Sequence, residues 1–204
     1  MTGIIFATEE EAAPFLEEYK RGRFDDLREG DTLFDDDIFV SLTGLGKIKA
    51  TLRTERFFQQ HRPERIIHAG MCTALSDQFS VGNLVAADQV FEGDRIELAA
   101  PTYPRMPLDV LFDDLPSGTL VTQDHVASNR SEKSYWQRIA DMSDMTGYAV
   151  AYVAATHGVP CHILKAVTGH ISDDTQEFRR NLTSACLAVS TFLVAKLGEM
   201  EAAQ

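Results

Sequence analysis

The chain has 204 residues and a formal net charge of −12, from 19 basic and 31 acidic side chains. Hydrophobic residues make up 44% and charged residues 25%, a balance typical of globular proteins and not of disordered ones. The length predicts a single domain over residues 1–204. The negative charge argues against nucleic acid or an anionic membrane as a partner, because both would repel it.

The first half of the chain alternates short apolar runs with helical segments. The predicted strands are 3–8, 33–34, 38–42, 65–69 and 82–90, and the predicted helices begin at Glu9 and at Lys47. Carboxylates from Glu9 onward favour a helix start because they complement the helix dipole. The three aspartates between Phe34 and Ile38 predict a hairpin turn, and the helix from Lys47 is expected to end near His61.

The second half continues the alternation. The predicted strands are 119–123 and 161–167, and the predicted helices are 131–142, 145–157 and one that begins near Asp174. Gly158 and Pro160 stop the second of these helices, and Asp174-x-x-Glu177 is a plausible capping box for the last. The segment 91–118 carries four prolines and is interpreted mostly as a loop. Strands alternating with helices predict a three-layer α/β fold.

Four segments carry a resemblance to known proteins. They are Gly3-Ile-Ile-Phe-Ala-Thr-Glu-Glu-Glu11, Gly44-Leu-Gly-Lys47 with Ala50, Ile66–Leu75 with Val81-Gly-Asn-Leu-Val85, and Asp144-Met-Thr-Gly-Tyr-Ala-Val-Ala151. In order and spacing they are similar to segments of methylthioadenosine/S-adenosylhomocysteine nucleosidases, in the nucleoside phosphorylase and nucleosidase superfamily. The resemblance extends to futalosine hydrolases. It implies an α/β/α fold with a central mixed sheet and a small-molecule nucleoside as ligand.

The activity implied is hydrolysis of the N-glycosidic bond of a purine-type or modified nucleoside. Such a reaction needs an activated water at the anomeric carbon, an acid near the base, and groups that orient the ribose. By resemblance, Glu11 accepts a proton from the attacking water; the alternative is a solvated carboxylate at a helix start, as expected for Glu9 and Glu10. Gly70 and Met71 are expected to line the floor of the pocket; the alternative for Gly70 is a buried turn glycine.

Asp144, Met145 and Thr146 resemble the ribose-binding motif of the family. Met145 would offer the sugar a soft apolar surface; the alternative is a methionine of the helix core. The second carboxylate of the family motif is replaced by Thr146, whose hydroxyl can bond a sugar but lacks a charge. The aromatic residue that stacks on the base in the family falls at Val126.

The general acid has two possible positions. An alignment without gaps places Gly169 where the family has its aspartate, and glycine can do no acid–base chemistry. A shift of four residues matches Ile171-Ser-Asp173 to the family triplet, so Asp173 is the predicted acid, with a helix cap as the alternative. His170 could stand in, because an imidazole is a competent acid near neutral pH.

Two other functions stay open. A phosphorylase needs a phosphate site, and phosphate-using relatives place arginines where this chain has Ala7-Thr8-Glu9 and His68. Hydrolysis is therefore favoured over phosphorolysis. The second alternative is a nucleoside-binding protein that kept the fold and lost catalysis, which Val126, Thr146 and Gly169 suggest.

No metal and no other cofactor is predicted. The histidines have no partners at metal-ligand spacing, and Cys72, Cys161 and Cys186 show no C-x-x-C pattern. Met1–Phe6 has no basic segment and no apolar stretch long enough for a signal peptide, so cytoplasmic residence with reduced thiols is expected. The resemblance also implies a homodimer or higher homo-oligomer.

Overall fold

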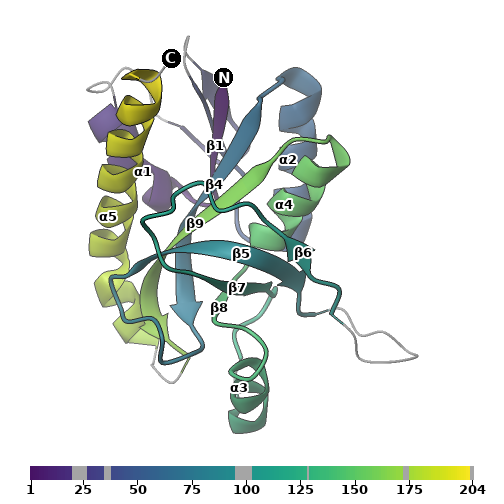
Figure 1. Ribbon diagram of the computed structural model, residues 1–204, viewed down its shortest axis with the longest axis vertical. Helices are drawn as coiled ribbons and strands as arrows, with labels where there is room; N and C mark the ends of the chain where they lie inside the picture. The colour runs from purple at the N-terminus through teal and green to yellow at the C-terminus, as the bar shows by residue number, and fades with distance from the viewer. Residues whose placement is uncertain (20–26, 35–37, 95–102, 128, 172–174, 203–204) are drawn as a thin grey trace.

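The computed structural model describes residues 1–19, 27–34, 38–94, 103–127, 129–171 and 175–202. Within these ranges the strands are β1 (Thr2–Phe6), β2 (Thr32–Phe34), β3 (Ile38–Leu42), β4 (Arg65–Ala74), β5 (Leu84–Glu92), β6 (Met106–Pro107), β7 (Ser117–Thr122), β8 (Met142–Asp144) and β9 (Cys161–His170). The helices are α1 (Glu9–Glu18), α2 (Lys47–Gln60), α3 (Arg130–Trp136), α4 (Gly147–Thr156) and α5 (Thr175–Ala202). Helices α1 and α5 cover one face of the sheet, and α2 and α4 cover the other (Figure 1). The predicted three-layer fold is confirmed.

The sheet is mixed, and part of it closes on itself. Strand β1 pairs in parallel with β3 and β4, and β2 adds an antiparallel edge. Beyond β4 the order continues through β8, β7 and β5, while β9 pairs in parallel with β4 and antiparallel with β5. Strands β4, β8, β7, β5 and β9 therefore form a closed ring. Closure brings residues that are far apart in the sequence into one interior.

Each helical layer packs its own apolar cluster against the sheet. One cluster joins Phe57 of α2 with Val150 of α4, and the other joins Phe15 of α1 with Val189 and Leu193 of α5. All five side chains are at most 2% exposed. Burial of this kind is the main stabilising contribution to the fold, at about 25 cal/mol per Å² of apolar surface removed from water.

Several predicted boundaries were wrong. Strand β4 runs on past Gly70 to Ala74, and the predicted helix 131–142 ends at Trp136. After that helix, Asp141 pairs with Thr119 through backbone and side chain, which leads the chain into β8. A three-residue strand carries too little periodicity to be recognised in a sequence. The predicted loop 91–118 contains β6 and the ends of β5 and β7, and its residues 95–102 lie outside the described residues, as does the predicted cap Asp174.

Helix α5 is the one described helix that is long and apolar enough to cross a membrane, with a mean hydropathy of 1.3 over Gln176–Met200. Length and composition alone are weak evidence, because core helices pass the same test. Its residues Ala185, Val189 and Leu193 are buried against the sheet and α1. This packing accounts for its apolar face as part of the α/β core.

Candidate active site

The Glu11 carboxylate is buried at the start of α1. Thr8 caps the helix, and its Oγ1 accepts a hydrogen bond from the Glu11 backbone at 3.2 Å. Glu11 Oε2 accepts from the backbone N–H groups of Ala7 at 3.0 Å and Thr8 at 3.1 Å, and Oε1 accepts from Met71 N–H at 3.0 Å. Glu11 is only 7% exposed. The alternative of a solvated carboxylate is therefore wrong.

Two opposing influences act on the acidity of Glu11. Burial raises its pKa above the ordinary value, because the charged form loses its hydration. The positive charge of Lys165 and the three backbone N–H donors oppose this rise without cancelling it. A carboxylate with a raised pKa, held in a fixed orientation, is suited to accept a proton near neutral pH.

Gly70 lies against this carboxylate. A Cβ atom at Gly70 would come within 2.7 Å of Glu11 Oε1 and 3.0 Å of its Cδ. Met71 is 6% exposed and supplies its N–H to the same oxygen. The structure thus brings together Glu11, Gly70 and Met71, three residues that the resemblance assigned to one site; their roles in that site stay predictions.

Replacing Gly70 by alanine is expected to push the Glu11 carboxylate away from Met71. The overpacking should lower the free energy of unfolding by about 1–3 kcal/mol and should disturb any chemistry that uses Glu11. Urea unfolding checks the stability. Gly198→Ala is the matched control, because nothing lies within 4 Å of a Cβ there. A Gly70 variant as stable as the Gly198 variant would contradict the predicted contact.

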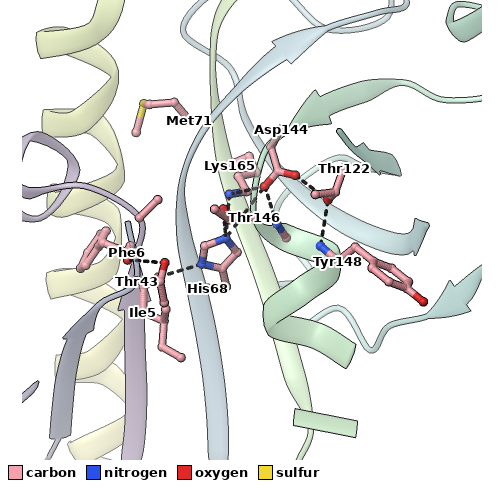
Figure 2. A network of polar contacts seen from close by, with 12 residues as sticks. Ile5, Phe6, Thr43, His68, Met71, Thr122, Asp144, Thr146, Tyr148 and Lys165 are labelled. Carbon is pink, nitrogen blue, oxygen red and sulfur yellow. Dashed lines mark hydrogen bonds and ion pairs between the residues drawn. The ribbon is translucent and has the colours of Figure 1, made fainter. Parts of the chain in front are cut away.

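Asp144 and Lys165 form a buried ion pair (Figure 2), and the charge of Lys165 acts on the Glu11 carboxylate. Lys165 Nζ lies 2.9 Å from Asp144 Oδ2, and the two side chains are 2% and 3% exposed. Asp144 Oδ1 accepts from Thr122 Oγ1 at 2.6 Å, and Oδ2 accepts from Gly147 N–H at 2.8 Å at the start of α4. Burial by itself would raise the pKa of Asp144, but Lys165 and its other partners hold it below the ordinary value.

His68 joins the same network in its neutral form. Its Nδ1 donates to the carbonyl of Ile5 at 2.9 Å, which leaves Nε2 as an acceptor. Lys165 Nζ at 3.1 Å and Thr146 Oγ1 at 3.0 Å both lie within reach of Nε2. Burial first, and the charge of Lys165 second, lower the pKa of His68 to about 3. The ring therefore stays uncharged near neutral pH.

The network draws on four strands of the closed ring. His68 lies on β4, Lys165 on β9, Asp144 on β8 and Thr122 on β7. Of these four residues only Asp144 was predicted as a site residue, together with Thr146, whose hydroxyl bonds to His68. The available signal was Lys165 itself, a lysine inside the apolar strand run 161–167, because lysine is almost never fully buried without a partner.

The comparisons with known proteins agree with this fold. The sequence profile of the phosphorylase superfamily matches residues 2–197. The chain belongs to the phosphorylase superfamily. Aminodeoxyfutalosine nucleosidase of Helicobacter pylori is 22% identical over 97% of this chain and 98% of that protein. The 5'-methylthioadenosine nucleosidase of Arabidopsis thaliana is 30% identical over 75% of this chain and 62% of that protein.

Solved structures show the same fold. The 5'-methylthioadenosine/S-adenosylhomocysteine nucleosidase of Helicobacter pylori aligns with a TM-score of 0.81 at 18% identity, covering 97% of each chain. The apo 5'-methylthioadenosine nucleosidase of Arabidopsis thaliana aligns with a TM-score of 0.80 at 22% identity, covering 98% of this chain and 94% of that one. The predicted superfamily and the predicted α/β/α fold with a mixed sheet are confirmed.

The other predicted site residues of this superfamily member lie in the loop after β7, between β8 and α4, and around the end of β9. Val126 is 78% exposed and takes no part in the network. Met145 is half-buried, between Asp144 and Thr146. Gly169 is paired within β9 opposite Thr73, and His170 ends that strand. Asp173 lies outside the described residues.

An open cavity of about 840 Å³ lies beside α3, apart from Glu11. Charged side chains line it, among them Lys47, Asp94, His125 and Glu132. These groups already pair with one another, Lys47 with Asp94 and His125 with Asp94 and Glu132. Over the described residues no cluster of three or more histidine, cysteine or acidic side chains has the geometry to hold a metal ion. This cavity is separate from the contacts around Glu11 and from the Lys165 network, neither of which lines it.

Proposed function

We propose that this chain is a nucleosidase that hydrolyses the N-glycosidic bond of a purine-type or modified nucleoside. The observation that carries the proposal is the buried Glu11 carboxylate, fixed by three backbone N–H groups beside Gly70. The nucleosidase activities named for its relatives in Helicobacter pylori and Arabidopsis thaliana support it.

The proposed reaction is direct attack of water on the anomeric carbon. The C–N bond to the base breaks, leaving positive charge on the sugar, and the water oxygen bonds to that carbon. Glu11 takes the proton that the water releases. General base catalysis of this kind contributes about 10²–10⁴-fold to a rate. Backbone N–H donors hold Glu11 in place, so little reorganisation accompanies the step.

The departing base needs a proton. Gly169 has no group to supply it, so we propose Asp173 as the acid, with His170 as the other candidate. Met145 and Thr146 are proposed to contact the ribose. The Thr146 hydroxyl is shared with His68 Nε2, so it would bind the sugar more weakly than a carboxylate would.

A second candidate function is nucleoside binding without catalysis. Thr146 is 2% exposed and bonded to His68, Val126 projects into solvent, and Gly169 carries no acid. Phosphorolysis has less support, because the N–H groups of Ala7 and Thr8 are already bonded to Glu11 and no arginine lies in that segment. If catalysis has been lost, installing carboxylates by Thr146→Glu with Gly169→Asp should create activity.

A panel of nucleosides distinguishes these functions. Purified protein is incubated with methylthioadenosine, adenosylhomocysteine, inosine and futalosine, with and without phosphate, and released base is measured. We expect release without phosphate. Binding of a nucleoside with no release from any member of the panel would favour the binding protein, and strict phosphate dependence would favour the phosphorylase.

We also propose that the chain forms a homodimer in the cytoplasm. An apolar surface supports the homodimer: Ile48 and Leu52 of α2 are 75% and 66% exposed, and Leu45 just before α2 is 51% exposed. Helix α4 packs beside α2 and adds Tyr152, which is 50% exposed. Apolar side chains grouped on one face are typical of subunit interfaces.

Light scattering coupled to size exclusion is expected to give twice the chain mass for the wild type. Ile48→Asp with Leu52→Asp should give the monomer mass, because two carboxylates cannot be buried unpaired in an interface. Leu187→Asp on α5 is the control, since Leu187 is 54% exposed on the opposite helical layer. A monomeric wild type, or a double variant that stays dimeric, would contradict the assignment.

A further inference from the structure

Lys165 is a buried cation that has no role in the proposed reaction described above. Its side chain is 2% exposed, and its ammonium group lies between Asp144 Oδ2 at 2.9 Å and His68 Nε2 at 3.1 Å (Figure 2). Burying a charge costs several kcal/mol unless partners compensate it. The chain therefore retains this charge in a place where an apolar side chain would fit the strand pattern.

The strand register brings Lys165 to the side of Glu11. Gly70 on β4 pairs in register with Lys165 on the parallel strand β9. Paired residues in neighbouring strands project to the same face of a sheet. The missing Cβ of Gly70 points at the Glu11 carboxylate, 2.7 Å from Oε1. The Lys165 side chain thus leaves the sheet on the face that carries Glu11, and its charge acts on that carboxylate.

Among the described residues, the buried region around Lys165 contains two carboxylates, one ammonium group and one neutral imidazole. Glu11 and Asp144 each carry one negative charge when ionised, Lys165 carries one positive charge, and His68 is neutral. In the described part of the chain, Lys165 is the cation that acts on both carboxylates. Without it, two like charges would share a water-poor interior, and one carboxylate would take up a proton.

We propose that Lys165 is a positioning residue: anchored by Asp144, its charge keeps Glu11 ionised and ready to accept a proton from water. This inference rests on the proposed nucleosidase reaction. Lys165 acts through Glu11 and touches no reacting atom. The negative charge of Asp144 partly offsets the positive charge of Lys165, so it weakens the influence of Lys165 on Glu11.

Other titratable groups near Glu11 do not supply this effect. Cys186 of α5 faces Glu11, but burial raises the pKa of its thiol to about 12, so it stays neutral. Glu10 on the same helix is exposed, and its charge has the same sign as that of Glu11. His68 stays uncharged near neutral pH. Asp144 and Lys165 are therefore the two charged groups that we expect to set the ionisation of Glu11.

Two substitutions should move the titration of Glu11 in opposite directions. Lys165→Met removes the favourable charge, so the pKa of Glu11 rises. Asp144→Asn removes the competing negative charge and keeps an acceptor for Gly147 N–H, so the pKa of Glu11 falls. Since Glu11 acts ionised, the acid limb of the pH profile of kcat/KM shifts to higher pH in the first variant and to lower pH in the second. On that limb, one pH unit corresponds to an about tenfold change in kcat/KM.

The same shifts can be read without substrate. Carbon-13 NMR of glutamate-labelled protein follows the Glu11 carboxyl through a pH titration, with Glu11→Gln to assign the signal. Lys165→Arg should restore the wild-type titration, and Lys196→Met, at a distant ion pair with Asp114, should leave it unchanged. Should Lys165→Met fail to fold by circular dichroism, Asp144→Asn and Lys165→Arg still decide.

Opposite shifts of the Glu11 signal, with rescue by arginine, support the proposal. An unchanged titration in both variants, or shifts in the same direction, overturns it. A wild type that releases no base refutes the proposed reaction, while the NMR titration still decides whether Lys165 sets the ionisation of Glu11. The two failures are therefore distinguishable.

Discussion

Glu11→Gln is expected to lower the rate of base release by about 10²–10⁴-fold, because an amide cannot take a proton from water. The substitution keeps the size of the side chain and one oxygen acceptor for the backbone N–H groups around it. The measurement is the initial rate of base release at saturating nucleoside, together with the affinity of the variant for the same nucleoside. Binding should be affected much less than turnover.

Glu10→Gln provides the matched control. Glu10 is the preceding residue of the same helix and is exposed, so its replacement should leave the rate close to that of the wild type. If Glu11→Gln kept a rate within a few fold of the wild type, Glu11 would only cap α1. The proposed mechanism would then need another base.

Asp144→Ala is expected to cost about 3–5 kcal/mol in the free energy of unfolding, because it leaves the Lys165 charge buried without its partner. The substitution also removes the acceptor for Thr122 Oγ1 and for Gly147 N–H. Total stabilities of about 5–15 kcal/mol make this a large effect. Urea unfolding at neutral pH measures it.

At acid pH the wild type and Asp144→Ala should differ less in their free energy of unfolding. The pKa of Asp144 is lowered in the folded protein, so its stabilising contribution is present above the unfolded pKa and is lost as the pH falls through the folded one. Asp114→Ala is the control, since the Asp114 pair with Lys196 lies at the surface, where solvent screening leaves an ion pair with little effect on stability. Equal losses in the two variants at neutral pH would contradict the buried pair.

Much of the architecture could be predicted from the sequence. The strands at 38–42 and 161–167 and the start of the helix at Glu9 carry local signals, and the structure has them. The predicted hairpin turn at 35–37 lies outside the described residues, but the strands on either side of it, β2 and β3, pair antiparallel. Glu11, Gly70 and Met71 were predicted together through a resemblance to known motifs, and the structure places them in contact. Glu11 and Met71 are 60 residues apart in the sequence, so the family motifs, and not a local pattern, assigned them to one site.

The rest depends on long-range pairing. Lys165 was read as one more residue of an apolar strand, because its partners Asp144 and His68 lie 21 and 97 residues away in the sequence. Only the ring of strands brings them together, and the residue pattern within one strand does not say which other strands it will pair with. The short strand β8 was not predicted at all, because three residues carry too little periodicity, and the predicted helix 131–142 ended at its first residue, Met142.

Tracing the oxygen that enters the sugar tests the central claim most directly. Protein and the preferred nucleoside are mixed in water enriched in oxygen-18, with and without phosphate, and the sugar product is analysed by mass spectrometry before it exchanges with solvent. Attack of water assisted by Glu11 predicts free base and a sugar that carries the heavy isotope at its anomeric carbon, whether or not phosphate is present. A sugar 1-phosphate, or a bound nucleoside recovered intact, would contradict it.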